Sequence, residues 1–154
     1  DLQQIVQRVC DNLQAVAQSH QVMLDLDTKG QPIMLLGDEN ALGQMVTNLV
    51  DNAIKYTPAM GEVHVVIEVN ASTALLSIKD DGIGIDEANQ ERIFERFYRV
   101  DKARSQSLGG TGLGLAIVKH IVQNHKGSLQ LKSKLNQGST FVIKIPLASG
   151  ENYY

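Results

Sequence analysis

The sequence predicts an α/β (α+β) two-layer sandwich, in which a mixed and mostly antiparallel sheet carries helices on one face. Three segments repeat apolar residues at spacings of three and four, as amphipathic helices do. Shorter segments alternate apolar and polar residues, as half-buried strands do. The 154 residues suit a single domain that is large enough to bury a real core.

The first half of the chain is expected to form two helices and a hairpin. Apolar residues recur at helical spacing over Leu2–Ala17, which predicts the first helix. An alternating strand follows at 22–26, with 33–36 as its hairpin partner. Asp38 is a suitable N-cap for the second helix, which Pro58 ends.

The middle of the chain is expected to contain two strands, a loop and a short helix. The strands are 63–69 and 74–79, joined by a turn. The loop is 80–84, and the short helix occupies 86–97, capped by its first residue. Residues 98–111 form a polar connection without periodicity, a length that usually belongs to a functional or mobile loop.

The last part of the chain is expected to form a helix and two strands. The helix covers 112–125 and is closed by Gly127. The strands are 128–134 and 140–145, the second with clear alternation. From Pro146 onward we expect a frayed tail.

Composition restricts the kind of partner. Fourteen basic against 17 acidic residues give a net charge of −3, which argues against nucleic acid as a partner. The sequence has no signal-peptide pattern and no apolar run long enough to span a bilayer, so we expect no membrane contact by this domain itself. Cys10 is the single cysteine and fits a reducing cytosol. The chain starts in helical periodicity without a methionine, which suggests a domain of a longer protein.

The glycine run at 109–115, Gly-Gly-Thr-Gly-Leu-Gly-Leu, leads directly into a predicted helix. Glycines leave backbone N–H groups uncovered and allow positive φ, and such a run before a helix forms a seat for an anion, usually phosphate. Its spacing matches neither the G-x-x-x-x-G-K-[S/T] loop nor the dinucleotide-binding fingerprint. Something other than these two motifs must therefore explain it.

Asn48, Asn52 and Lys55 form a polar row on the second predicted helix. They fall within about 60° of one another around the helix axis, away from its apolar stripe. A solvated face would give the same pattern. An Asn carbonyl on Mg²⁺ and a Lys on a phosphate oxygen would also give it, because hard cations prefer oxygen ligands.

The loop Asp80-Asp81-Gly82-Ile83-Gly84 follows a predicted strand. An Asp-Gly loop is most often only a turn. Asp80, however, stands where an apolar strand ends, and a partly buried carboxylate there needs hydrogen-bond donors. The exocyclic amine of adenine would supply one, and Gly82 and Gly84 would let the backbone approach the base closely.

Phe94, Phe97 and Tyr98 are expected to anchor the short helix to the core. Positive charge lies among and after them, at Arg96, Arg99, Lys102 and Arg104. Such a run is usually solvated, although beside a phosphate site it could clamp the γ-phosphate.

Five motifs occur in a fixed order: Asn48-x-x-x-Asn52, Asp80-x-Gly82-x-Gly84, Phe94-x-x-Phe97, Gly110-x-Gly112-x-Gly114 and Gly138-Ser139-Thr140-Phe141. In this order they resemble the N, G1, F, G2 and final boxes of histidine-kinase catalytic domains. These domains belong to the ATPase superfamily shared with type II topoisomerases, heat-shock chaperone ATPases and mismatch-repair ATPases. The likeness spans 1–147, leaves 148–154 as a C-terminal tail, and implies the Bergerat (GHKL) ATPase fold with ATP and Mg²⁺ as cofactors.

At the phosphate end, the resemblance implies three catalytic residues. Asn52 is similar to the main Mg²⁺ ligand, with Asn48 beside it, and Lys55 to the phosphate-contacting lysine. Tyr56 resembles the aromatic residue that lines the nucleotide. Chaperone and topoisomerase relatives have a Glu in place of Asn48 as general base, and an amide cannot accept a proton at neutral pH. Hydrolysis is therefore expected to be suppressed in favour of transfer to a protein side chain.

At the adenine end, Asp80 resembles the aspartate that reads the base, in a pocket shaped by Gly82 and Gly84. Ser139 occupies the Ser/Thr position that completes this pocket through water. Residues 98–111 resemble the ATP lid, hinged by the glycine run. The other cofactor-binding residues that the resemblance implies are Ile85, Tyr98, Arg99, Gly110, Thr111, Gly112, Leu113, Gly114, Leu115 and Thr140.

The resemblance implies the catalytic half of an enzyme. A histidine kinase phosphorylates a histidine on a separate dimerisation domain, where an acidic residue follows the histidine and an Arg-x-Pro lies downstream. None of the four histidines has this context: His20, His64, His120 and His125. The acceptor histidine is therefore expected to lie on another domain.

The expected activity is transfer of the γ-phosphoryl group of ATP to that histidine, in two-component signalling. The expected partners are the phosphoacceptor domain and, through the full-length protein, a response regulator. The expected location is the cytoplasmic side of a membrane-anchored sensor kinase. A nucleotide-binding regulatory module without transferase activity, and a serine kinase or ATPase of the same superfamily, stay open as alternatives.

Overall fold

The computed structural model describes residues 1–100 and 112–149. Within them lies a five-stranded sheet of order β1-β2-β3-β5-β4. Its strands are β1 (Met23–Thr28), β2 (Glu62–Asn70), β3 (Thr73–Asp80), β4 (Ser128–Ser133) and β5 (Ser139–Pro146). β1 pairs with β2 in parallel, and all other neighbours are antiparallel. The predicted mixed, mostly antiparallel sheet is confirmed.

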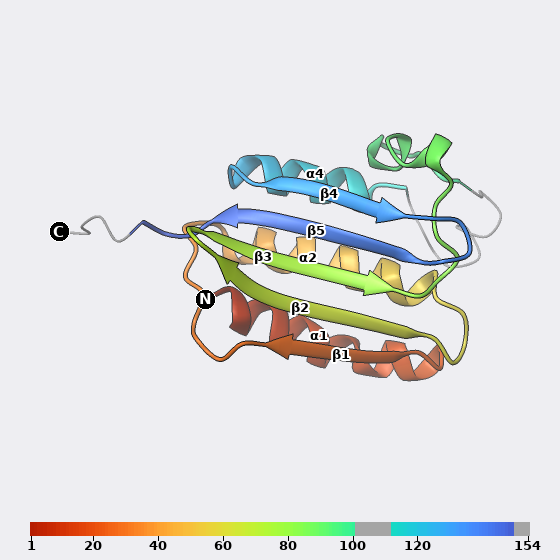
Figure 1. Cartoon of the computed structure of the whole chain (residues 1–154), viewed down its shortest axis with the longest axis horizontal. Coiled ribbons are helices and arrows are strands. Elements are labelled where there is room, and N and C mark those ends of the chain that lie inside the picture. Colours follow the sequence, from red (N-terminus) through yellow and green to blue (C-terminus); the bar gives the residue numbers. More distant parts are fainter. Residues whose placement is uncertain (101–111, 150–154) are drawn as a thin grey trace.

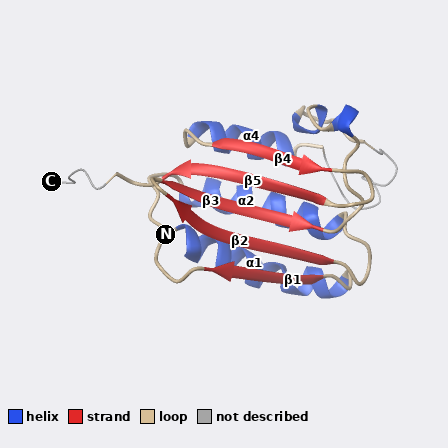
Figure 2. Ribbon diagram, in the orientation of Figure 1, coloured by secondary structure: helices blue, strands red, loops and turns tan. Residues whose placement is uncertain are grey.

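Helices cover one face of this sheet, as predicted (Figures 1 and 2). They are α1 (Leu2–Ser19), α2 (Glu39–Lys55) and α4 (Gly114–Asn124). Asp38 caps α2 as expected, because its carboxylate accepts a hydrogen bond from the N–H of Ala41 at 3.0 Å. No helix in the described ranges is long and apolar enough to cross a bilayer.

The core lies between the helices and the inward face of the sheet. Alternate residues of the central strands are buried, as the period of two requires. The apolar stripe of α2 covers them, and its members Met45, Val46, Val50 and Ile54 are fully buried. The opposite, polar side of α2 remains half exposed, and it carries the row that begins at Asn48.

The predicted hairpin of 22–26 with 33–36 is wrong. The chain over 29–38 forms no strand, and β1 pairs with β2 instead. Ile33 is buried, and its carbonyl accepts from the N–H of Leu2 at 2.8 Å, so this segment packs beside the start of α1. Alternation identifies extended chain but not its partner, and here the crossover through α2 supplies the parallel neighbour.

The predicted helix over 86–97 is also wrong in kind. Two single 3₁₀ turns replace it, η1 (Glu87–Asn89) and η2 (Arg92–Phe94), although Asp86 does cap the first. The prediction of a frayed tail from Pro146 is wrong for Leu147 and Ala148, whose N–H groups donate to the carbonyls of Ser72 and Met34, each at 2.9 Å; residues 150–154 lie outside the described ranges.

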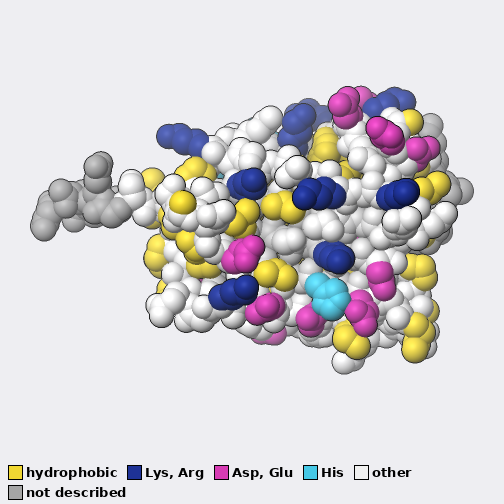
Figure 3. All heavy atoms as spheres, in the orientation of Figure 1, with side chains coloured by type: hydrophobic (Ala, Val, Ile, Leu, Met, Phe, Trp, Pro, Cys, Tyr) yellow, Lys and Arg dark blue, Asp and Glu magenta, His cyan; other side chains and the backbone are white. Residues whose placement is uncertain are grey.

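The helix-free face of the sheet carries mostly polar and charged side chains, including a histidine among acidic groups (Figure 3). The register places His64 on β2 between Asp25 on β1 and Lys79 on β3. Nε2 of His64 lies 2.9 Å from the carboxylate of Glu62, and Nδ1 contacts the carboxylate of Asp25. The hydrogen bond with Glu62 is the main cause that raises the pKa of His64; burial opposes it, and Asp25 raises the pKa further.

Stability should therefore fall as pH rises above the ordinary histidine pKa. A folded-state pKa above the unfolded value of 6.5 contributes stability that is complete below 6.5 and is lost as pH rises through the folded pKa. The effect is small, since the His64 side chain is 40% exposed and salt screens its ion pairs. Urea unfolding between pH 5.5 and 8.5 measures it, and His64→Gln should flatten the slope. An equal slope in this variant would assign the dependence to other groups.

Candidate functional site

The predicted site residues gather at one end of the sheet. β3 ends there at Asp80 and β5 begins there at Ser139, directly opposite in register. The C-terminal end of α2 and the first turn of α4 lie at the same end, on the right in Figure 1. Segments that are far apart in the sequence thus meet around Asp80.

Asp80 is a buried carboxylate, 7% exposed, at this meeting point. Its Oδ1 accepts two backbone hydrogen bonds, from Gly82 at 2.9 Å and from Ser139 at 3.2 Å. Its Oδ2 accepts none from the described residues. Burial raises the pKa of Asp80, the two backbone N–H groups partly oppose this, and the charge of Asp81 adds to it. One oxygen of a buried carboxylate is therefore open to a donor from outside the chain.

The loop after Asp80 lies against the end of α2. The N–H of Ile83 donates to the carbonyl of Tyr56 at 3.3 Å. A Cβ on Gly82 would lie 2.5 Å from that same carbonyl oxygen and 2.8 Å from Oδ1 of Asp80. Only glycine allows the loop to lie this close to the end of α2, while the predicted approach of Gly82 to a base stays a prediction.

Gly84 closes the other side of this loop. Its φ is +69°, and a Cβ there would lie 2.0 Å from the carbonyl oxygen of Lys134. Next to it, the carbonyl of Ile83 accepts from the N–H of Asn136 at 2.7 Å. The loop is thereby fixed to the turn between β4 and β5.

Gly84→Ala should destabilise the fold by about 2–4 kcal/mol, because left-handed strain and a backbone clash add. Gly30→Ala is the matched control, since its φ is +86° but nothing lies within 4 Å of the new Cβ. It should cost only about 1 kcal/mol. Urea unfolding of both variants measures the difference, and equal losses would show that the contact with Lys134 is not tight.

Ser133 was not predicted from the sequence. Its Oγ accepts from the N–H of Ile85 at 2.8 Å, donates to the carbonyl of Gly138 at 3.0 Å and lies 2.8 Å from Oγ of Ser139. It stands between two lysines at the end of a strand, where a serine carries no recognisable signal. Its position is visible only in the register, which places it opposite Ser139.

On α2, the polar row faces the start of α4. The amide nitrogen of Asn48 donates to the carbonyl of Gly114 at 3.2 Å, so this side chain joins the two helices. The Nζ of Lys55 lies 2.9 Å from the carboxylate of Asp51, one turn earlier. The side chain of Asn52 makes no hydrogen bond with the described residues. Its amide is therefore open to a ligand.

Gly112 joins the start of α4 to the aromatic segment. Its carbonyl accepts from the N–H of Phe97 at 2.8 Å, and both residues have positive φ. A Cβ on Gly112 would lie 2.8 Å from the Cα of Phe97. The helix begins at Gly114, two residues later than predicted, because a left-handed residue cannot belong to an α-helix.

The remaining predicted residues divide into three groups. Leu113 lies at the N-cap position of α4 and makes no capping hydrogen bond with its side chain, and Leu115 and Ile85 pack partly buried against the core. Tyr98 bonds to Asn89 and lies under the guanidinium of Arg92, 4.3 Å from its ring centre, while Arg99 is half-buried nearby in sequence. Gly110 and Thr111 lie outside the described ranges. So do residues 101–111 of the segment 98–111 that is predicted to be the lid.

Thr140 is separated from the other predicted residues. It follows Ser139 on β5, so its side chain lies on the helix-free face, opposite Lys79 and Lys132. The alternation of the strand therefore leaves only its backbone near Asp80. The resemblance had grouped the two hydroxyl residues, and the pleat separates them.

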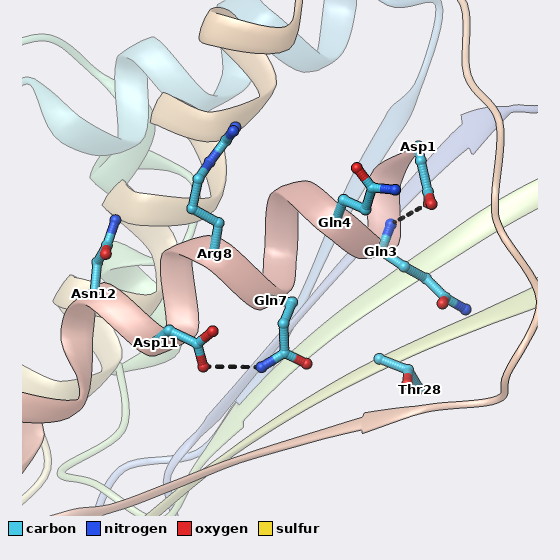
Figure 4. A pocket seen from close by; sticks show the side chains of 8 residues that line it. All are labelled: Asp1, Gln3, Gln4, Gln7, Arg8, Asp11, Asn12 and Thr28. Atoms are coloured by element: carbon cyan, nitrogen blue, oxygen red, sulfur yellow. Dashed lines mark hydrogen bonds between the residues drawn. The ribbon is translucent and has the colours of Figure 1, made fainter.

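Two further observations concern ligands. In residues 1–100 and 112–149, no three His, Cys, Asp or Glu side chains converge as a metal site would require. A hollow with polar lining lies outside α1, between its exposed face and Thr28 (Figure 4). The register aligns Thr28 with Ile67 and, across β2, with Leu76, and the hollow lies outside α1, so it is separate from the site around Asp80.

Residues 37–149 match the histidine kinase-, DNA gyrase B- and HSP90-like ATPase family. The chain therefore belongs to this family. Within it, the chain is a catalytic ATPase domain of the sensor histidine kinase type, because its similar proteins are sensor kinases.

Three similar proteins illustrate the relationship. The sensor-like histidine kinase SenX3 of Mycolicibacterium smegmatis is 43% identical over 146 residues, which are 95% of this chain and 38% of SenX3. The structure of the mycobacterial sensor histidine kinase MprB superposes with a TM-score of 0.81 at 30% identity, covering 96% of this chain and 95% of that one. Full-length ShkA, solved in complex with AMPPNP, gives 0.84 at 27% identity, covering 97% and 31%. The chain thus spans little more than a third of SenX3.

Proposed function

We propose that the domain, residues 1–147, binds ATP with Mg²⁺ and transfers the γ-phosphoryl group to a histidine on a separate dimerisation domain. The observation that carries the proposal is Asp80, a buried carboxylate with one oxygen bonded twice to the backbone and the other open. Such a carboxylate suits an exocyclic amine, which donates a hydrogen bond and carries no competing charge.

The adenine would lie against the backbone of Gly82 and Gly84 in the loop. Gly82 and Gly84 stand where any side chain would collide with neighbouring carbonyl oxygens, so the surface they offer is bare backbone. The carbonyl of Tyr56 accepts from the N–H of Ile83 in this loop, Ile85 follows the loop in the chain, and Ser139 adjoins Asp80. The residues present therefore suit a flat base better than a bulky polar group.

The triphosphate would extend toward α2 and the start of α4. Asn52 would hold Mg²⁺ through its amide oxygen, and Lys55 would exchange its ion pair with Asp51 for a phosphate oxygen. Asn48 would keep α4 in place through Gly114. Mg²⁺ would supply neutralisation of the charge on the transferring group, while the protein supplies position. That ShkA was solved in complex with AMPPNP supports the proposal that this chain binds a nucleotide.

An amide at position 48 also favours transfer over hydrolysis. Asn48 cannot take a proton from water at neutral pH, and its nitrogen is committed to Gly114. A phosphoacceptor domain and a response regulator are the proposed partners in the whole protein. A cytoplasmic position in a membrane-anchored sensor kinase is proposed from the similarity to sensor proteins.

The test combines this chain with the dimerisation domain of its own parent kinase and γ-labelled ATP–Mg²⁺. We expect acid-labile, base-stable phosphate on that domain, and none when its acceptor histidine is replaced by alanine. Bound ATP without any phosphohistidine would instead indicate a regulatory nucleotide-binding module. Acid-stable phosphoserine or rapid release of free phosphate would indicate a serine kinase or an ATPase.

A further inference from the structure

Asp80 is the first of three polar residues that form a row across the sheet. Asp80 on β3 lies opposite Ser139 on β5, and Ser139 lies opposite Ser133 on β4. Side chains that face each other in register share one face of the sheet, here the face that the helices cover. Ser139 and Asp80 are buried and Ser133 is half-buried, so water screens the row weakly.

The proton count of Ser133 fixes the direction of the hydrogen bonds in this row. A serine hydroxyl has one proton and two lone pairs. The N–H of Ile85 occupies one lone pair of Ser133 at 2.8 Å. The proton of Ser133 has two possible acceptors, the carbonyl of Gly138 at 3.0 Å and Oγ of Ser139 at 2.8 Å.

The proton of Ser133 is donated to the carbonyl of Gly138 rather than to Ser139. Without it, this carbonyl would keep only the N–H of Lys134, at 3.4 Å, which is a weak hydrogen bond. With Ser133 donating to Gly138, the remaining lone pair of Ser133 receives the proton of Ser139. All groups around Ser133 are then paired, and no proton of Ser139 is left for the pocket.

We infer that Ser133 is a positioning residue that sets base specificity: by taking the proton of Ser139, it presents Ser139 beside Asp80 as a hydrogen-bond acceptor only. This inference rests on the proposed function. Two adjacent acceptors favour a purine with a 6-amino group, which has two N–H donors to give, directly or through water. They disfavour a 6-oxo group, because its oxygen would face two other acceptors.

The test compares ATP with ITP, which carries a 6-oxo group, in the presence of Mg²⁺. Dissociation constants are measured by calorimetry, or by displacement for the weaker ligand, on the wild-type chain, Ser133→Ala and Ser133→Thr. We expect wild type to prefer ATP. In Ser133→Ala the hydroxyl of Ser139 is free to turn and donate, so ITP binds more tightly. The ratio of the ITP to the ATP dissociation constant should therefore fall roughly three- to tenfold.

Ser133→Thr keeps a hydroxyl and should retain the wild-type preference. Ser128→Ala, an exposed serine on the same strand, is the control and should change neither constant. A purely structural role would weaken ATP and ITP by the same factor. An unchanged ratio in Ser133→Ala would therefore overturn the inference.

If circular dichroism shows that Ser133→Ala does not fold, Ser139→Ala tests the same inference. It removes the acceptor itself, so the preference should narrow through weaker binding of ATP, and an unchanged ratio again overturns the inference. Absence of ATP binding by the wild-type chain would contradict the proposed function as well. ATP binding with an unaltered ratio contradicts only the role of Ser133.

Discussion

Asp80→Asn is expected to weaken ATP binding by roughly 30- to 150-fold, the equivalent of about 2–3 kcal/mol. The amide can keep both backbone hydrogen bonds through its oxygen, from Gly82 and Ser139. Its NH₂ group then stands where the open carboxylate oxygen was. A donor would face the donor of adenine, and the charge-assisted hydrogen bond would be lost.

Calorimetry with ATP and with adenosine measures this effect, and both ligands should lose affinity by similar factors. Asp81→Asn is the matched control. Asp81 is the next residue and is exposed, and its carboxylate accepts from the N–H of Glu62 at the start of β2, at 2.8 Å. Unchanged ATP affinity in Asp80→Asn would defeat the assignment of Asp80 to the base.

The same substitution should leave the free energy of unfolding unchanged or higher at neutral pH. The pKa of Asp80 is raised in the folded state, chiefly by burial, so the buried charge lowers stability above that pKa. This loss is recovered as the pH falls through the folded pKa. Asn carries no charge and escapes the loss. Under the proposed function, the protein retains at Asp80 a ligand-binding group at the expense of stability.

Asn52→Ala is expected to reduce phosphoryl transfer by about 100-fold or more, because it removes the proposed oxygen ligand of Mg²⁺. Binding of adenosine should not change, since Asn52 lies on α2 and makes no hydrogen bond with the loop around Asp80. ATP affinity should lose its dependence on Mg²⁺. Calorimetry with and without Mg²⁺, and the phosphotransfer assay, measure the two effects.

Gln44→Ala is the control for this prediction. Gln44 is an exposed amide on α2, eight residues before Asn52 and thus roughly 12 Å away along the axis. It should have full activity. If Asn52→Ala weakened adenosine and ATP equally, the residue would act on the shape of the pocket rather than on the phosphates.

The motifs could be predicted from sequence because each depends on residue type and local order. A glycine beside a buried aspartate, or amides one turn apart on a helix, leave a signature that does not require knowledge of the neighbours. For Gly82 and Gly84, the structure gives the physical reason, since a Cβ would meet a carbonyl oxygen. The roles of Asn52 and Lys55 toward ATP stay predictions.

What could not be predicted depends on partners across the sheet. Residues 33–36 are a short apolar run after Gly30 and Pro32 that reads like a hairpin strand, but the parallel partner of β1 is supplied by a crossover that such local signals do not encode. Thr140 shares a motif with Ser139, yet the pleat sends its side chain to the other face. Ser133 has no motif, and it matters because the register of β4 on β5 brings its hydroxyl to Ser139.

The hydrogen bond between Phe97 and Gly112 has a consequence for engineering. It joins Phe97, three residues after η2, to Gly112, two residues before α4, so these two positions of the chain lie side by side. A foreign module whose own termini are adjacent can be inserted there without pulling η2 from α4. Under the proposed function, a reporter domain inserted there would change its signal when nucleotide binds, and the protein would become a sensor.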